Sequence, residues 1–147
     1  MANDHGIPWQ GKIPSDVAYF RDKTLHGNVM MGYGWYVEQK QPLPERRNIV
    51  ATTKDEPMRS GFETAHDARE FLKNFEEDIW VGGGAALFAS ILDLADELYI
   101  TQLQGDWHCT KFFPDFKQYF ELATEGEPTT ENNVTFSFQI WKRKAKL

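Results

Sequence analysis

The chain has 147 residues, of which 41% are hydrophobic and 14% aromatic, which fits one globular domain with a substantial core. It contains no apolar stretch of the roughly 18 residues that a membrane helix needs, and no signal peptide, so we expect a cytoplasmic protein without a membrane partner. The net charge of −6 argues against nucleic-acid binding, and a single cysteine is compatible with a reducing compartment.

The first half of the chain alternates loops, helices and short apolar strands. A loop with two prolines and a glycine, residues 8–14, precedes an expected helix over residues 15–25. Ser15 or Asp16 is expected to cap that helix, with Val17, Phe20 and Thr24 on one face. Further strands are expected at residues 28–32, 48–53 and 62–64, with a proline-containing turn at residues 41–45.

The second half continues this alternation and ends in two strands. Asp67 is expected to open a helix that continues to Phe75. The remaining expected elements are a strand at 78–81, a helix at 85–92, strands at 97–103, 119–123 and 134–142, and a polar loop at 126–133. The pattern predicts one α/β domain over residues 1–147, with a mixed, mostly parallel sheet flanked by helices and a C-terminal antiparallel hairpin.

Three glycines, Gly82, Gly83 and Gly84, follow the short apolar run 79–81 and precede a good helix start. Glycine lets another backbone or a ligand approach closely, and free N–H groups at a helix start suit phosphate. The stretch therefore indicates a strand–turn–helix that holds a nucleotide. A tight turn without a ligand is the alternative, because a glycine run alone is a weak motif.

Asp16 is the most suggestive titratable residue, because it stands between a Pro-Trp loop and a helix with an apolar face. One interpretation is a plain helix cap, a common role for aspartate. The other is a carboxylate in a half-apolar pocket, where it can bind an amidine-like group through two hydrogen bonds.

Charged and hydroxyl side chains flank the expected strand at 48–53. Arg46 is either a solvated residue at a strand start or an anchor for a ligand carboxylate or phosphate. Thr52, Thr53 and Lys54 lie at the carboxyl end of the strand, where ligands of such sheets bind, and are candidates for phosphate contact. The four histidines lack the spacing of a zinc site, so no metal is expected.

Seven fragments occur in a definite order along the chain. They are Pro8-Trp9; Pro14-Ser15-Asp16 with Phe20 and Thr24; Val29-Met30-Met31-Gly32; Pro42-Leu43-Pro44 with Arg46 and Asn48; Ile79-Trp80-Val81-Gly82-Gly83-Gly84; Leu98-Tyr99-Ile100-Thr101; and Thr110-Lys111-Phe112-Phe113-Pro114. Each fragment is modest, but together, in an order and spacing that run from about residue 6 to the C-terminus, they resemble the dihydrofolate reductase family.

The resemblance implies a role for individual residues. Asp16 holds the pterin ring and favours protonation at N5, Thr101 hydrogen-bonds that carboxylate, and Trp9 helps to hold an ordered water. Ile7, Val17, Phe20 and Val81 contact the pterin and aminobenzoyl groups, and Arg46 pairs with the carboxylate of the glutamate tail. The implied cofactor residues are Gly32, Tyr33, Trp35, Thr52, Thr53, Lys54, Gly82, Gly83, Gly84, Ala85 and Phe88, and a cis peptide is expected at Gly82–Gly83.

The implied activity is NADPH-dependent reduction of 7,8-dihydrofolate to tetrahydrofolate, and antifolates are the implied inhibitors. Two alternatives keep the fold. One is a folate- or nucleotide-binding protein with little catalysis, and the other is a pyrimidine reductase of riboflavin synthesis. Asp16 with Phe20 and Arg46 favours a folate-shaped ligand over the latter.

The sequence departs from the family in two places. The family starts with an apolar strand of about a dozen residues that is not found before Pro8, so we expect a truncated sheet, a sheet closed differently, or a strand from another molecule in an otherwise monomeric protein. Tyr33 and Trp35 stand where the family has arginine and threonine. Loss of that positive charge predicts weaker NADPH binding unless Lys54 compensates.

Overall fold

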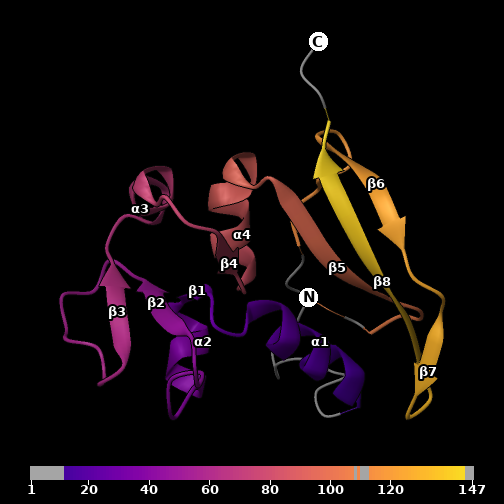
Figure 1. Cartoon of the computed structure of the whole chain (residues 1–147), viewed down its shortest axis with the longest axis horizontal. Coiled ribbons are helices and arrows are strands. Elements are labelled where there is room, and N and C mark those ends of the chain that lie inside the picture. The colour runs from indigo at the N-terminus through magenta and orange to yellow at the C-terminus, as the bar shows by residue number, and fades with distance from the viewer. Residues whose placement is uncertain (1–11, 108, 110–112, 145–147) are drawn as a thin grey trace. The chain divides into compact units, whose positions relative to one another are not determined.

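The computed structural model describes residues 12–107, 109 and 113–144 (Figure 1). Internal contacts group the chain into two compact units, residues 20–94 and residues 1–19 with 95–147. The prediction of one domain over the whole chain stays a prediction. In the part of the chain that the structure describes, no helix is long and apolar enough to cross a membrane.

The unit formed by residues 20–94 is built on a four-stranded parallel sheet with the order β3-β2-β1-β4. Its strands are β1 (Asn28–Gly32), β2 (Arg47–Ala51), β3 (Phe62–Ala65) and β4 (Ile79–Val81). The continuous apolar runs of β1 and β2 suit strands that are covered on both faces. Val29, Met30, Met31, Ile49 and Val50 are accordingly fully buried.

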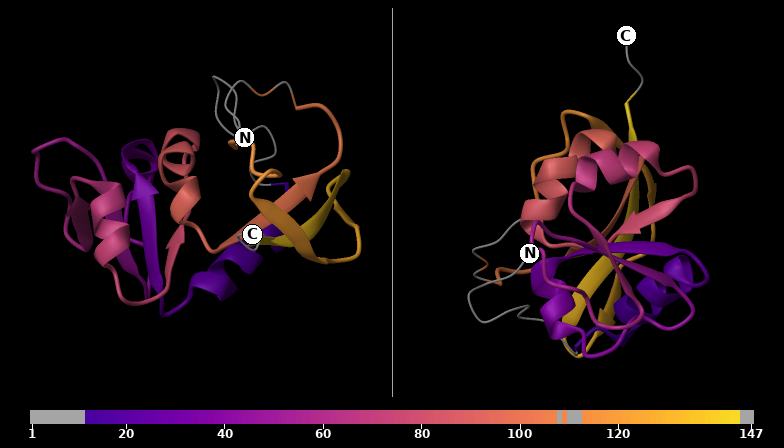
Figure 2. Two further views of the ribbon diagram at one scale, coloured as in Figure 1. Left: turned by 90° about the horizontal axis from the view of Figure 1, so that it is seen from above. Right: turned by 90° about the vertical axis from the view of Figure 1, so that its left-hand side faces the viewer.

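Helices cover both faces of this sheet (Figure 2). Alternate residues of a strand point to opposite faces. Met31 therefore packs with Tyr36 of α2 (Tyr33–Glu38), whereas Met30 packs towards α3 (Ala68–Asn74) and α4 (Ala85–Ile91). Because β1, β2 and β4 are parallel, their carboxyl ends lie at the same edge of the sheet.

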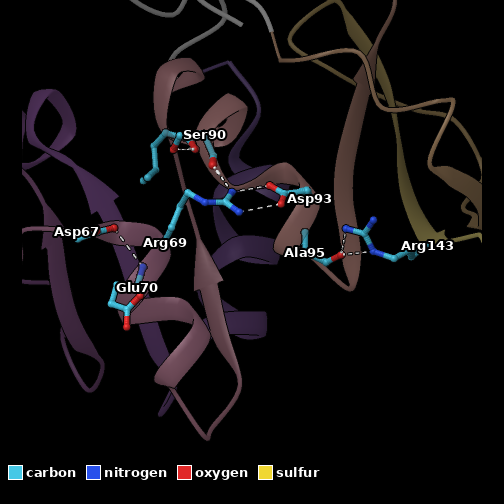
Figure 3. A network of polar contacts seen from close by, with 8 residues as sticks. Asp67, Arg69, Glu70, Ser90, Asp93, Ala95 and Arg143 are labelled. Atoms are coloured by element: carbon cyan, nitrogen blue, oxygen red, sulfur yellow. Dashed lines mark hydrogen bonds and ion pairs between the residues drawn. The ribbon is translucent and has the colours of Figure 1, made fainter.

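Two charged contacts fix the helices of this unit (Figure 3). Asp67 caps α3 by accepting a 3.1 Å hydrogen bond from the Glu70 amide, as its position predicts. Arg69 of α3 donates to the Ser90 carbonyl at 2.8 Å and forms a bidentate pair with Asp93 of the short 3₁₀ helix η1 (Leu92–Leu94). These bonds tie α3 to the end of α4.

The other unit contains an antiparallel sheet with the order β5-β8-β6, to which β7 adds along β8. The elements are β5 (Glu97–Leu103), β6 (Phe120–Glu125), β7 (Thr129–Glu131), β8 (Val134–Arg143) and the first part of α1 (Pro14–Thr24). Ile13, Leu103, Val134 and Phe136 form its buried core, with Trp107 and Phe138 packed against them. Arg143 closes the sheet end by donating to the Ala95 carbonyl (Figure 3).

In the described part of the chain, each sheet ends in a strand that pairs with a single neighbour. Among the residues with described positions, β4 pairs with β1 alone and β5 pairs with β8 alone. The described chain thus contains two separate four-stranded sheets rather than one continuous sheet.

Two segments differ from the prediction. Residues 33–38, for which no element was predicted, form α2. The predicted loop 126–133 contains β7, because its polar residues pair with β8. In β8 the polar residue Gln139 is buried, at 8% exposed, and its polar atoms are paired, since its amide donates to Glu125 and its oxygen accepts from Trp141.

Candidate functional site

The start of α1 is capped by a residue distant in sequence, and the prediction that Ser15 or Asp16 caps it is wrong. The amides of Asp16 and Val17 donate to the Ile13 carbonyl at 3.1 and 3.4 Å. Glu131 of β7 accepts from the Ser15 amide at 3.0 Å and from the Ser15 hydroxyl at 2.6 Å. The side chain of Asp16 is consequently not used as a cap.

The Asp16 carboxylate accepts a 2.6 Å hydrogen bond from the Thr101 hydroxyl of β5. The expected contact between these two residues is therefore present. One turn later, the Tyr19 ring stacks on Phe138 with centroids 4.1 Å apart. Burial, and secondly the charge of Asp16, raise the pKa of Tyr19, which keeps this phenol neutral.

The remaining substrate candidates of α1 have different surroundings. Val17 is 66% exposed, so it does not belong to a buried helix face with Thr24, which is fully buried. Phe20 is half-buried, and its ring lies 5.9 Å from that of Trp35.

Arg46 is held by groups of its own unit. Its Nε donates to the Pro44 carbonyl at 3.0 Å, and its Nη1 donates to the Thr24 hydroxyl at 3.1 Å. That hydroxyl in turn donates to the Phe20 carbonyl at 2.8 Å. The guanidinium is thus half-buried in a fixed orientation and has further N–H donors for a ligand carboxylate.

The glycine turn lies directly on the end of β1. The Gly32 amide donates to the Gly83 carbonyl at 2.8 Å, and the Gly82 amide donates to the Met30 carbonyl at 3.0 Å. A Cβ on Gly82 would lie 2.2 Å from the Trp35 ring, whereas a Cβ on Gly84 would meet nothing within 4 Å. The turn therefore needs glycine for packing at Gly82 and leaves the backbone open at Gly84.

The cis peptide of the glycine run is Gly83–Gly84, one bond later than the predicted Gly82–Gly83. Gly83 has φ of +132°, a conformation that favours glycine. Phe88 of α4 lies next to Gly83: a Cβ added to Gly83 would be 3.6 Å from the Phe88 ring. Ala85 begins α4 directly after the turn.

Tyr33 stands between a negative and a positive side chain at the end of β1. Its hydroxyl donates a short hydrogen bond to Glu56, and the Lys54 ammonium lies 4.7 Å from the centre of its ring. The hydrogen bond to Glu56, followed by desolvation, raises the pKa of Tyr33. Tyr33 therefore has a cation beside it, Lys54, and also a carboxylate that was not predicted, Glu56.

The remaining predicted residues of this unit lie near the ends of their strands. Thr52 follows β2 and is fixed by its own contacts, since its amide donates to the Ala65 carbonyl and its hydroxyl accepts from the Lys54 amide. Thr53 is exposed, and Val81 is the last residue of β4. Ile7 and Trp9 lie outside the described residues.

Two further observations bound the site. A shallow cavity of about 520 Å³ lies along α3 and contains none of the predicted residues; it is lined by Arg47, Thr64, Ala65, His66, Asp67, Glu70, Phe71, Asn74 and Phe75. Within residues 12–107, 109 and 113–144 there is no cluster of three or more side chains that suits a metal.

Two residues at the site, Glu131 and Glu56, were not predicted from the sequence. Nothing local identifies Glu131, because it caps a helix 116 residues earlier. A signal existed on the helix side, since the Ser15 amide needs an acceptor that its neighbours do not provide. Glu56 lies in the segment after β2, 23 residues from its partner Tyr33, and the two side chains come into contact only in the folded chain.

Comparisons with known proteins agree with the fold and with the predicted family. The family model described as dihydrofolate reductase matches residues 1–143. Dihydrofolate reductase of Haemophilus influenzae is 34% identical, covering 98% of this chain and 91% of the relative, and that of Bacillus subtilis is 27% identical, covering 98% and 88%.

A solved structure shares the fold. Dihydrofolate reductase from Enterococcus faecalis, complexed with NADP(H) and RAB-propyl, superposes with a TM-score of 0.86 at 24% identity, covering 99% of this chain and 89% of that one. The predicted α/β fold is thereby confirmed. Together with the match over residues 1–143, these likenesses show that the chain belongs to the dihydrofolate reductase family.

Proposed function

We propose that this chain reduces 7,8-dihydrofolate to tetrahydrofolate with NADPH, and that it does so in the cytoplasm. The observation that carries the proposal is the Asp16–Thr101 hydrogen bond in a chain of this family. The single cysteine, Cys109, supports a reducing compartment.

Asp16 is the proposed catalytic carboxylate. Thr101 fixes one of its oxygens, and a carboxylate has further lone pairs with which it can accept from the amidine-like edge of a pterin. A negative charge there stabilises the cationic form of the ring that is protonated at N5. Trp9 is proposed to hold an ordered water for this protonation.

Substrate contacts are proposed for Ile7, Val17, Phe20, Arg46 and Val81. Arg46 is assigned to the carboxylate of the glutamate tail, because its bonds to Thr24 and Pro44 already fix its guanidinium. A fixed, charged donor binds a carboxylate with little further loss of side-chain entropy.

Cofactor contacts are proposed at the carboxyl ends of β1, β2 and β4. When bound, NADPH supplies the hydride. The open backbone at Gly84 fits a pyrophosphate, and Lys54 beside Tyr33 fits a phosphate charge. The other proposed contacts are Gly32, Trp35, Thr52, Thr53, Gly82, Gly83, Ala85 and Phe88.

Absorbance at the NADPH band tests the proposal. The purified protein should oxidise NADPH when dihydrofolate is added and should not do so without it. Absence of this dihydrofolate-dependent loss would contradict the proposal. If a methotrexate-like antifolate still bound under those conditions, the chain would be a folate-binding protein without catalysis.

A further inference from the structure

We infer that Glu131 is a positioning residue for Asp16: through Ser15 it holds the first turn of α1 and with it the Asp16 carboxylate. The role given to Asp16 rests on the proposed function. The role given to Glu131 rests on contacts within one compact unit of the chain.

At the start of α1 one backbone amide needs an acceptor from outside the helix. The first N–H groups of a helix have no partner within the helix. Here Pro14 has no N–H, and the amides of Asp16 and Val17 both use the Ile13 carbonyl. The Ser15 amide is the group that requires an outside acceptor, and Glu131 provides it at 3.0 Å.

The contact between Glu131 and Ser15 is bidentate. Glu131 engages Ser15 with both carboxylate oxygens, one on the amide and one on the hydroxyl, so it fixes orientation as well as distance. The next residue, Asn132, donates through its side chain to the Lys12 carbonyl at 2.8 Å. Two adjacent residues therefore hold the segment that leads into Asp16.

The tip that carries these residues is itself well defined. Glu131 pairs with Val134, and between them Asn132 and Asn133 both have positive φ, 47° and 66°. Two consecutive residues in this conformation make a tight hairpin turn that matches strand twist, and asparagine tolerates it well. The tip of the β7–β8 hairpin is thus a compact support for Glu131.

One strand connects both contacts of the segment. On β8, Phe138 lies opposite Thr101 and Val134 lies opposite Glu131. Thr101 holds Asp16, and Glu131 holds the preceding residue, so β8 sets the distance between the two holding points. Because Glu131 takes over the capping role, the Asp16 carboxylate stays available for Thr101 and for a ligand.

The first test measures amide hydrogen exchange in the full chain. Glu131→Ala should speed exchange of the Ser15, Asp16 and Val17 amides about tenfold, since losing a cap costs roughly 1–2 kcal/mol. Glu127→Ala is the matched control, because it removes an exposed glutamate that precedes β7. Unchanged exchange in Glu131→Ala would overturn the inference, whether or not the protein is a reductase.

The second test separates positioning from mere folding. The probe is a 2,4-diaminopyrimidine, whose protonated amidine pairs with a carboxylate. Glu131→Ala should weaken its binding about tenfold when Asp16 is present and less than about twofold in an Asp16→Asn background. Equal losses in both backgrounds would show that Glu131 does not act through Asp16 and would overturn the inference.

Two controls complete this design. Glu131→Gln keeps an acceptor oxygen for Ser15 and should recover most of the affinity. If Glu131→Ala does not fold, Ser15→Ala takes its place, because it removes the hydroxyl that donates to Glu131 and should cause a loss in the same direction. Failure of the unmodified protein to reduce dihydrofolate would contradict the proposed function. The role of Glu131 would still be decided by the hydrogen exchange and by the dependence of its binding effect on Asp16, since neither measurement requires turnover.

Discussion

The ammonium of Lys54 lies 4.7 Å from the centre of the Tyr33 ring, on a tyrosine whose hydroxyl is bound to Glu56. The electron-rich face of an aromatic ring attracts a cation, so the Tyr33 ring orients the Lys54 ammonium. The family resemblance puts an arginine at the Tyr33 position. We propose that Lys54, which follows a neighbouring strand, supplies the missing positive charge and that the charge of Glu56 reduces its effect.

This relationship predicts the outcome of Lys54→Met. The variant should bind NADPH about two- to fivefold more weakly, because it loses the proposed charged contact to phosphate, and such a contact is weak in an exposed position. Binding of NADH, which lacks the additional phosphate, should change little. Fluorescence titrations with both cofactors measure this, with Lys73→Met on α3 as the control, and equal losses for the two cofactors would refute the assignment of Lys54.

Thr101→Val removes the hydroxyl that Asp16 accepts from while keeping the shape of the side chain. Losing one partner of a hydrogen bond to a charged group costs about 1.5–3 kcal/mol. We expect kcat/KM for dihydrofolate to fall by at least about tenfold, with Thr101→Ser close to the unmodified protein. An unaffected valine variant in steady-state kinetics would mean that the bond has no functional role.

The glycine turn predicts two different alanine phenotypes. Gly82→Ala places a Cβ 2.2 Å from the Trp35 ring, so it should destabilise the fold by about 1–3 kcal/mol in thermal unfolding. Gly84→Ala meets no atom within 4 Å and should keep its melting temperature but bind NADPH more weakly. Normal NADPH affinity in Gly84→Ala would argue against close approach of the cofactor there.

Tyr19 reports the charge of Asp16. Burial, and then Asp16, raise the pKa of this phenol above its usual value, so its contribution to stability is complete below about pH 10 and is lost as pH rises through the raised pKa. Asp16→Asn should lower the pKa of Tyr19 without returning it to the usual value, because burial remains. Ring-carbon NMR of labelled tyrosine, assigned with Tyr19→Phe, measures this; an unchanged pKa would show that the two groups do not interact.

The sequence predicts those elements whose burial follows from a continuous local pattern. The apolar run Val29-Met30-Met31 gives β1 with the predicted bounds 28–32, and β5 likewise has the predicted bounds 97–103. The Asp16–Thr101 contact was also predictable, but only through the family resemblance, since 85 residues separate the two.

The elements that the sequence does not predict depend on partners distant in the chain. Helix α2 has only six residues, including Gly34, and is stabilised by packing of Tyr36 on Phe62 and by Arg59 donating to the Tyr36 carbonyl. Strand β7 is polar and exists because it pairs with β8. Glu131 was not predicted as the cap of α1 for the same reason, because its partner Ser15 is 116 residues away in the chain.

The most direct test compares Asp16→Asn with the unmodified protein in dihydrofolate-dependent oxidation of NADPH. Asparagine keeps the size of the side chain and an acceptor for Thr101 but removes the charge that we propose to favour a protonated pterin. We expect kcat to fall by roughly 10²–10⁴-fold, the usual contribution of acid–base catalysis, while an Asp22→Asn control keeps its rate. A rate in Asp16→Asn within about twofold of the unmodified protein would contradict a catalytic role of the Asp16 carboxylate.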